Sequence, residues 1–318
     1  MRAPSLPATV LVPVLVLAGT LVGPPSPAHA ATTCRDQAAT IEASEGTVEG
    51  TPGPDVIVVT GTNTKVLAGE GDDTICVVGG AGVVGVDAGP GNDVVDTTAA
   101  GVPTDTVLGP GADTFTGGPQ SDTVRSSGDA ATDTVATGAG RDTFTTYANG
   151  PVVVDLGPDD DILSFNATAG TAGSQLDLGD GSDLLLVEDA VDLAIDLAEG
   201  TLVQKGVVSK AVHAEDVQAS GRDVVVRGDD SDNDVRVTGC RVTLSGDGGN
   251  DVLAQIGQPA QPDPTCKVKA TLRGQGGKDR LRGFSGRDTL IGGRGRDIAN
   301  GGSGRDRCSA ERVRRCER

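Results

Sequence analysis

The segment GFSGRDTLIGGRGRDIANGGSGRDRC, which spans Gly283–Cys308, repeats one short pattern every nine residues. A glycine stands two places before each aspartate of the pattern, and a lysine or arginine stands directly before it. The aspartates of this series are Asp279, Asp288, Asp297 and Asp306. A period this short and regular indicates one nine-residue structural unit that is stacked many times.

The same pattern, written G-G-x-G-x-D-x-U-x with U apolar, continues upstream through most of the chain. The residue two places after the aspartate is apolar in fourteen of fifteen cases, and only Arg236 departs from the rule. An apolar position held in phase predicts one core side chain per unit. The fifteen aspartates are Asp55, Asp73, Asp93, Asp113, Asp122, Asp133, Asp142, Asp161, Asp183, Asp234, Asp251, Asp279, Asp288, Asp297 and Asp306.

The period predicts an all-β fold, a parallel β-roll or β-solenoid with glycine-aspartate turns. Six glycine-rich residues suit a turn that needs positive φ, and the next three suit a short strand whose middle side chain faces inward. Two units of nine residues then complete one coil. The steps of about one coil between Asp55, Asp73, Asp93, Asp113 and Asp133 indicate one edge of the solenoid, and those between Asp122, Asp142, Asp161 and Asp183 indicate a second.

Composition agrees with a thin core and sets the sign of the charge. The 318 residues include 48 glycines, no tryptophan, one tyrosine and four phenylalanines, so valine, leucine and isoleucine must fill the core. From Cys266 onward there are 15 Lys and Arg against six Asp and Glu, a net charge of +9, which leaves −28 for the rest. So acidic a body repels nucleic acid and anionic membranes and attracts cations.

The first 30 residues are expected to be a signal peptide. Arg2 gives a charged start, an apolar run follows, and the small-residue site Ala28–Ala30 predicts cleavage after Ala30. The alternative is a membrane anchor, but the run is short for a span and Pro13 interrupts it. We therefore expect a secreted, extracellular protein with no membrane span after cleavage.

Four segments are expected after the signal peptide. Residues 31–190 form an acidic solenoid with degenerate repeats, 191–235 form spacer coils, and 236–308 form the nonapeptide block with a Pro-rich loop at 258–264. Residues 309–318 form a basic C-terminal cap. The spacer lacks the turn motif over most of its length, and an ordinary β-rich stretch remains the alternative reading of it.

The repeat resembles the RTX, or hemolysin-type, calcium-binding nonapeptide family, most closely over Gly274–Cys308. The resemblance implies a β-roll in which oxygen atoms of stacked turns bind Ca²⁺, with Asp279 beside Asp297 and Asp288 beside Asp306. The implied carboxylate ligands are Asp73, Asp93, Asp113, Asp142, Asp161, Asp183, Asp251, Asp279, Asp288, Asp297 and Asp306. The implied carbonyl ligands are those of Gly69, Gly71, Gly89, Gly91, Gly283, Gly292, Gly293, Gly295, Gly301, Gly302 and Gly304.

Six cysteines in an exported chain favour disulfides, since none has the spacing of a zinc site. Cys240 and Cys266 head equivalent segments, so stacking would bring them together. The preferred set is Cys34–Cys76, Cys240–Cys266 and Cys308–Cys316. It rests on proximity alone among fifteen possible pairings.

Enzyme chemistry has little support in the sequence, because the mature chain would keep one histidine, His213, and no G-x-S-x-G or H-E-x-x-H motif is present. We expect a non-catalytic structural, adhesive or surface-associated protein whose partners are calcium ions and cell-surface or matrix components. One alternative is a cation-independent, disulfide-stapled spacer or binding surface. A second is a β-helix polysaccharide lyase or epimerase, which the lack of aromatic sugar platforms disfavours.

The cation before each C-terminal aspartate leaves two possibilities open. The arginine can point outward, or it can pair with the carboxylate and stand in for a metal. Family turns often carry Asn there, as Asn92 and Asn250 do here. We therefore expect the C-terminal block to bind calcium less tightly than the turns Gly71–Asp73 and Gly91–Asp93.

Overall fold

The structure, a computed structural model, describes residues 32–128, 130–147, 149–166, 172–258 and 265–317. The expected signal peptide lies outside the described residues, as does nearly all of the Pro-rich loop. Within the described ranges every regular element is a β-strand. Across those same ranges no helix has the length and apolar character needed to cross a membrane.

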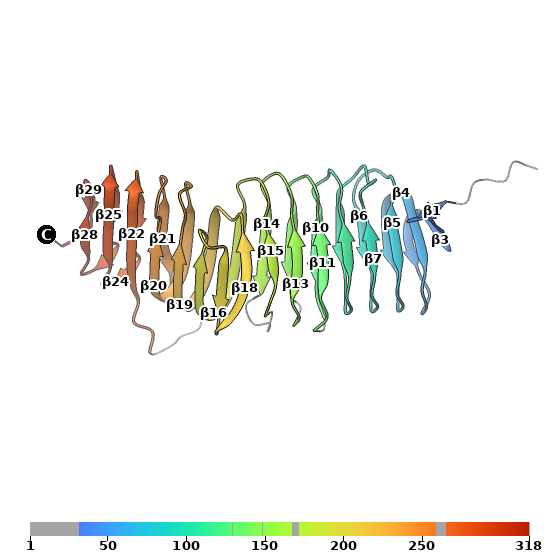
Figure 1. Cartoon of the computed structure of the whole chain (residues 1–318), viewed down its shortest axis with the longest axis horizontal. Helices are drawn as coiled ribbons and strands as arrows, with labels where there is room; N and C mark the ends of the chain where they lie inside the picture. The colour runs from blue at the N-terminus through green and yellow to red at the C-terminus, as the bar shows by residue number, and fades with distance from the viewer. Residues whose placement is uncertain (1–31, 129, 148, 167–171, 259–264, 318) are drawn as a thin grey trace, which may run out of the picture. The chain divides into compact units, whose positions relative to one another are not determined.

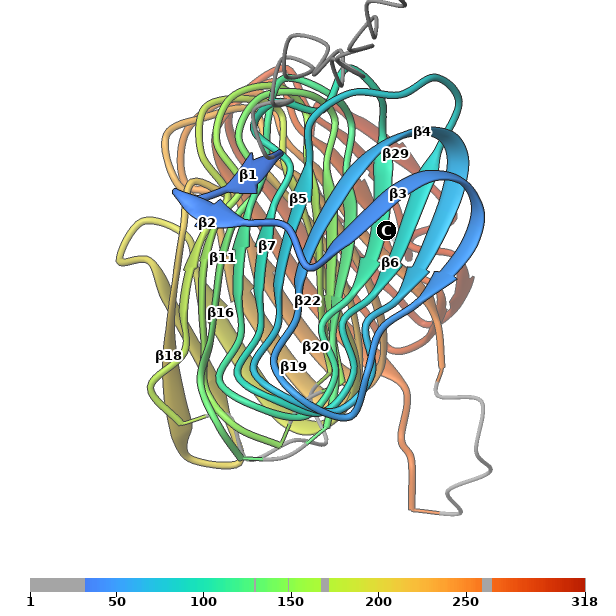
Figure 2. The same ribbon diagram turned by 90° about the vertical axis from the view of Figure 1, so that its right-hand side faces the viewer.

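The described chain winds as a parallel β-solenoid of about 13 turns, which confirms the predicted fold (Figure 1). Each coil lays one short strand on each of two faces. The solenoid begins with β3 (Ile41–Glu49) and β4 (Val56–Leu67), two long strands that bend from the first face to the second. Figure 2 looks along the stack from its N-terminal end and shows the coils superposed around one core.

The first face holds parallel strands one coil apart, such as Ile57, Ile75 and Val95 in register. Its strands are β5 (Thr74–Val77), β7 (Val94–Asp96), β9 (Thr114–Thr116), β11 (Asp133–Ala136), β13 (Val152–Asp155), β15 (Gln175–Asp177), β17 (Thr201–Gln204), β18 (Val207–Val212), β22 (Lys269–Gly277), β25 (Thr289–Gly295) and β28 (Arg307–Ser309).

The second face is parallel throughout. Its strands are β6 (Val84–Asp87), β8 (Thr104–Val107), β10 (Thr123–Ser126), β12 (Thr143–Thr146), β14 (Ile162–Asn166), β21 (Val252–Gly257), β23 (Arg280–Arg282), β26 (Ile298–Asn300) and β29 (Arg312–Arg314). Three long strands serve both faces, as β4 does: β16 (Leu184–Asp196), β19 (Asp216–Arg227) and β20 (Asp234–Ser245).

One hairpin interrupts the parallel order of the first face. Strand β17 pairs antiparallel with both β16 and β18, and β18 then continues the parallel ladder from β15. Lys205 and Gly206 form its turn with φ of 48° and 79°, as a two-residue hairpin turn that follows the strand twist requires. This insertion lies in the segment expected to be a spacer.

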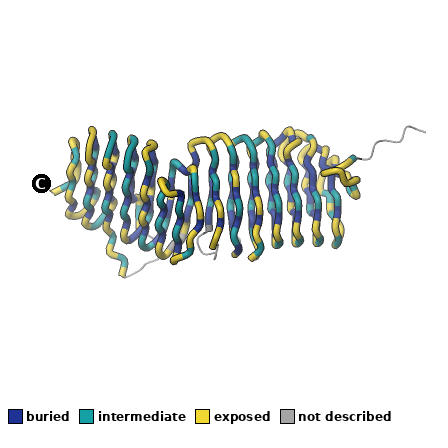
Figure 3. Tube along the Cα trace, in the orientation of Figure 1, coloured by how far each residue is buried: buried dark blue, intermediate teal, exposed yellow. Residues whose placement is uncertain are grey.

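The core is a stack of inward-facing apolar side chains. Figure 3 marks the buried residues as dark blue segments of the Cα trace. On the second face one row of buried side chains runs through successive coils. In order, it consists of Val66, Val86, Thr106, Val124, Phe144 and Leu163. The expected inward side chain of each unit is therefore in the core, but several strands bury a second one, such as Val84 beside Val86 and Phe165 beside Leu163.

The turns need glycine because the coils stack at close range. Gly91 has a φ of 157°, and a Cβ there would collide with the carbonyl of Gly71 one coil earlier. A side chain at this position would push the coils apart and open the ladder between them.

Two small sheets and three disulfides complete the described fold. The hairpin of β1 (Thr33–Cys34) and β2 (Gln37–Ala38) is antiparallel, and β24 (Ser285–Gly286) pairs parallel with β27 (Ser303–Gly304). The disulfides join Cys34 to Cys76, Cys240 to Cys266 and Cys308 to Cys316, the same pairs that proximity suggested.

Candidate metal centre

The repeat aspartates stack in columns at the turns, and each column is a hydrogen-bonded ladder. In the first column the Oδ1 atom of each aspartate accepts the backbone N–H of the equivalent residue one coil earlier. Asp73 accepts from Asp55 at 2.8 Å, Asp93 from Asp73 at 2.8 Å, and Asp113 from Asp93 at 2.9 Å. Asp133 then accepts from Asp113 at 3.0 Å, so the ladder is continuous over five coils.

The second column runs along the other edge and reaches the C-terminal block. Asp142 accepts from Asp122, Asp161 from Asp142 and Asp183 from Asp161, at 2.6–2.7 Å. Further along, Asp279 accepts from Asp251 and Asp297 from Asp279, both at 3.0 Å. A third, short column pairs Asp288 with Asp306 at 2.9 Å. The eleven aspartates proposed as metal ligands therefore all lie in these columns, and the pairs 279/297 and 288/306 stack as expected.

Three members of the second column are not aspartates, and the sequence pattern did not predict them. Glu215 accepts the N–H of Asp183 at 2.9 Å, and Glu311 accepts that of Asp297 at 2.8 Å. Asn233 donates its N–H to Asp251 at 3.0 Å, so this coil is in register at Asn233 and the fit of Asp234 to the motif was one residue late. The irregular Arg236 was the signal of that shift.

In ten of the column aspartates the second carboxylate oxygen is buried and accepts no hydrogen bond. Buried polar atoms in proteins are nearly always satisfied, so a row of such atoms marks a place for a further ligand. The residues with an unpartnered Oδ2 are Asp73, Asp93, Asp142, Asp161, Asp183, Asp251, Asp279, Asp288, Asp297 and Asp306.

Burial also disfavours the charged form of these carboxylates. Desolvation, together with repulsion from neighbouring acids, raises the pKa of Asp93, Asp161 and Asp251 to about 7. It raises the pKa of Asp142, Asp183 and Asp288 to about 6. A cation placed among them would reverse this effect by stabilising the ionised form.

In the C-terminal coils the free oxygen lies in a buried inner corner of the turn, against the residue five places before the aspartate, where it takes the place that a side chain would occupy. This corner residue is glycine at Gly246, Gly274, Gly283, Gly292 and Gly301. A Cβ added to Gly274 would meet both Asp279 Oδ2 and the carbonyl oxygen of Gly292 from the next coil within 3.0 Å. Gly283 has the same arrangement with Asp288 and Gly301.

These converging oxygens are the donor set that a hard cation takes. The corners at Gly246, Gly274, Gly283 and Gly301 each bring one carboxylate oxygen and one main-chain carbonyl of the next coil together. In the described chain no three acidic, His or Cys side chains gather as a metal cluster. The residues present therefore fit Ca²⁺, which accepts backbone carbonyl ligands, better than a metal that needs several side chains.

In six coils of the acidic body the corner residue carries a side chain: Ala68, Ala88, Leu108, Thr137, Leu156 and Leu178, all fully buried. It is glycine again before Asp55, Asp122 and Asp133, whose Oδ2 atoms accept hydrogen bonds from Thr51, Thr97 and Ser126. The carbonyls of Gly69 and Gly71 point at Gly89 and Gly91 of the next coil. Of the proposed carbonyl ligands, those of Gly292 and Gly301 are brought beside an unpartnered carboxylate oxygen.

The cations before the C-terminal aspartates do not take the place of a metal. Asp279, Asp288, Asp297 and Asp306 each keep an unpartnered Oδ2, so no preceding lysine or arginine reaches it. These cations are exposed at the turn surface. The two possibilities left open by the sequence resolve in favour of the outward orientation.

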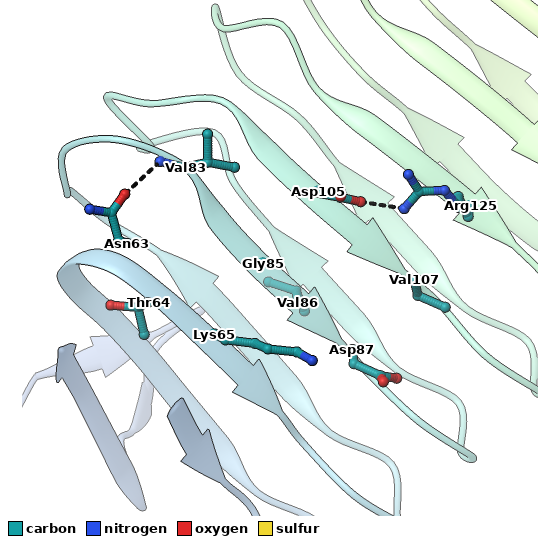
Figure 4. A pocket seen from close by; sticks show the side chains of 10 residues that line it. All are labelled: Asn63, Thr64, Lys65, Val83, Gly85, Val86, Asp87, Asp105, Val107 and Arg125. Atoms are coloured by element: carbon teal, nitrogen blue, oxygen red, sulfur yellow. Dashed lines mark hydrogen bonds and ion pairs between the residues drawn. The ribbon is translucent and has the colours of Figure 1, made fainter. Parts of the chain in front are cut away.

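A separate groove lies on the second face over β4, β6, β8 and β10 (Figure 4). Gly85 hollows it, because neighbouring strands carry Lys65 and Asp105 at the same level. A Cβ at Gly85 would meet only Lys65 Cγ at 3.8 Å, so the fold itself does not require glycine there. Arg125 pairs with Asp105 at its end, and no aromatic side chain lines it.

The RTX calcium-binding nonapeptide repeat matches the chain in four copies, within residues 127–148 and 273–308. The second match covers the corner glycines Gly274, Gly283, Gly292 and Gly301, and the first covers Asp133 and Asp142. Among curated proteins there is no match to the chain. Two segments of this parallel β-solenoid therefore match the RTX calcium-binding nonapeptide repeat.

Proposed function

We propose that this protein is a secreted, non-catalytic, calcium-binding β-roll with a structural or adhesive role at a surface, and that its folding is coupled to Ca²⁺. The observation that carries the proposal is the row of buried, unpartnered Oδ2 atoms, which in the C-terminal coils face a carbonyl of the next coil. Such a row is unfavourable without a cation and well suited to one.

The corner residue of each coil indicates how tightly that coil should bind calcium. Gly246, Gly274, Gly283, Gly292 and Gly301 let the carboxylate oxygen enter the corner, whereas the corner residue of six coils in the body carries a buried side chain of its own. This favours the C-terminal block as the tighter binder, the reverse of the order expected from charge alone. The body aspartates remain candidate ligands of lower rank.

Each part of the chain has a defined role in this proposal. The Oδ1 atoms hold successive coils in register through backbone N–H groups, and the Oδ2 atoms and corner carbonyls supply oxygen ligands. Bound calcium would neutralise the carboxylates and link adjacent turns, so that binding free energy adds to folding free energy. The proposed secretion rests on the expected signal peptide and on the three disulfides.

Calcium titration followed by circular dichroism, with and without a chelator, tests the proposal. We expect the β-sheet signal and the cooperativity of unfolding to rise in the millimolar calcium range and to fall again with chelator. Unchanged spectra together with no bound metal would favour the rival, a cation-independent spacer held by apolar stacking and disulfides.

The groove at Gly85 favours a second candidate, a saccharide-directed activity on the second face. It brings together acidic and basic side chains, Lys65, Asp87, Asp105 and Arg125, as a polysaccharide lyase or epimerase site would. Incubation with uronic-acid polysaccharides and detection of unsaturated products tests this candidate. No turnover by the calcium-loaded protein would remove it.

A further inference from the structure

The outer side chains along the second column change their hydrogen-bonding character at Lys278. One coil before, Asp232 Oδ1 accepts the N–H of Asn250 at 2.6 Å, and Asn250 Oδ1 accepts the N–H of Lys278 at 3.1 Å. Lysine and arginine side chains only donate, so this outer row of acceptors ends at Lys278. From there the edge presents donors and positive charge.

Three cations surround a hollow at this point. Its lining is Asn250, Gly277, Lys278, Arg294, Gly295 and Arg296, with no carboxylate among them. All three cationic side chains are exposed and belong to two adjacent coils, since Gly277 pairs with Gly295 in the ladder. None of the three forms an ion pair with any residue in the described ranges.

The aspartates that directly follow Lys278 and Arg296 do not line the hollow. Asp232 and Glu311 are exposed acids of neighbouring coils, and they accept the N–H groups of Asn250 and Asp297. Asp279 and Asp297 follow Lys278 and Arg296 directly, but both carboxylates are buried on the inner side of the turn. The Oδ1 atom of Asp297 is engaged by the N–H of Asp279. The turn therefore separates charge by side, with carboxylates inside and cations outside.

We propose that this hollow binds a sulfate or phosphate group. A tetrahedral oxyanion offers several hydrogen-bond acceptors. They match the donors of the two guanidinium groups, Arg294 and Arg296, and of the Lys278 ammonium group. The surrounding segment from Cys266 onward has a net charge of +9, which would attract such a group, and the acidic body would repel it elsewhere. The ligand differs in sign from calcium, so this site is independent of the proposed metal centre.

The opposite edge of the same block provides a matched control. Arg287 and Arg305 occupy the same motif position on stacked turns, next to the paired strands β24 and β27. Arg305 lies 3.6 Å from Glu317, which offsets part of its charge. Neutralising either pair changes the net charge equally, so a difference between them reports the hollow and not the overall charge.

Isothermal titration calorimetry of the full, calcium-loaded protein with sucrose octasulfate at low salt measures the affinity that tests this proposal. We expect the double variant Lys278→Gln/Arg296→Gln to bind at least about tenfold more weakly, since it loses two charge-assisted contacts. The variant Arg287→Gln/Arg305→Gln should change affinity by less than about twofold. Lys278→Arg should retain binding, and circular dichroism should show all variants folded.

Dextran sulfate and phosphatidylglycerol vesicles serve as further probes of the source of the group. Loss of binding confined to the Lys278/Arg296 variant with any probe supports the hollow, and the probe bound best identifies a small ester, a polymer or a lipid headgroup. Equal losses in the two double variants, or no binding by the unaltered protein, would overturn the proposal.

Discussion

The column aspartate uses its two carboxylate oxygens differently, and this division decides what a substitution does. Oδ1 accepts a backbone N–H from the preceding coil, which any side-chain carbonyl can also do. Oδ2 is buried and unpartnered, and only a cation makes full use of it. The structural and metal-binding contributions of one residue can therefore be separated experimentally.

Asp297→Asn and Asp297→Ala separate these contributions. Asparagine keeps the acceptor for the Asp279 N–H, so without calcium its unfolding free energy should stay within about 1 kcal/mol of the unaltered protein. Alanine leaves that buried N–H unsatisfied and should cost about 1–3 kcal/mol. With calcium, both variants should lose the stabilisation from this coil. Urea unfolding in chelator and in calcium measures both; an asparagine variant with a full calcium response would contradict the role of Oδ2.

Gly292→Ala tests directly whether the glycine corner beside Asp297 is needed for calcium binding. Its Cβ would fall within 3.0 Å of the Asp297 carboxylate, and φ at Gly292 is not in the left-handed region, so the effect is steric. We expect one fewer calcium per molecule by titration calorimetry. Ala88→Gly is the control, because it opens the matching corner in the body; it should cost about 1 kcal/mol through lost core contacts and reduced strand stability. Unchanged stoichiometry in Gly292→Ala would count against the corner site.

At this scale the sequence predicted the aspartates well, because their period and apolar companion are both written in the chain. It did not predict Glu215, Asn233 or Glu311, since a longer or neutral side chain can reach the same N–H without keeping the motif. Nor did it predict that Ala88 and Leu108 fill the corner, because an apolar residue before a turn looks the same whether it faces in or out.

Among the elements, the short strands and the glycine-rich turns followed from the repeat, but the long strands β4, β16, β19 and β20 and the hairpin of β17 and β18 did not. Alternating burial is the same in parallel and antiparallel strands, so the pattern of residues 201–212 carries no direction. The Lys205–Gly206 turn was the available signal, since glycine readily supplies the positive φ that such a turn needs. Stacking of equivalent segments suggested Cys240–Cys266, and proximity along the chain suggested the other two disulfides.

The disulfide Cys308–Cys316 should stabilise the last coils and little else. In a solenoid each coil contacts only its neighbours, so stability is transmitted over short distances. The double variant Cys308→Ser/Cys316→Ser should speed hydrogen exchange in β26, β28 and β29 and leave β5 to β12 unchanged. Removing Cys240–Cys266, with a separation of 26 residues against 8, should cost more, about 3 kcal/mol in the chain-entropy account. Uniform acceleration along the chain would contradict this local effect.

For the whole molecule, the buried carboxylates set the dependence of stability on pH. Burial raises the pKa of Asp93, Asp161 and Asp251 to about 7 in the fold, against about 3.9 in the unfolded chain. The folded state then binds more protons, so without calcium stability is greatest near pH 4 and falls as pH rises towards 7. Thermal unfolding in chelator should show a higher midpoint at pH 5 than at pH 8. In saturating calcium the loss should shrink, because bound cations favour the ionised carboxylates; a midpoint that rises with pH in chelator would contradict it.

The central claim is that calcium held between coils completes a fold that the chain builds only in part alone. Urea unfolding of the intact protein at a series of free calcium concentrations tests it most directly. Each site bound only in the folded state should add about 1.4 kcal/mol to the unfolding free energy per tenfold rise in calcium above its dissociation constant. With several corner sites the predicted slope exceeds that of one site, and Gly292→Ala lowers it. An unfolding free energy that stays constant from chelator to millimolar calcium would contradict the account.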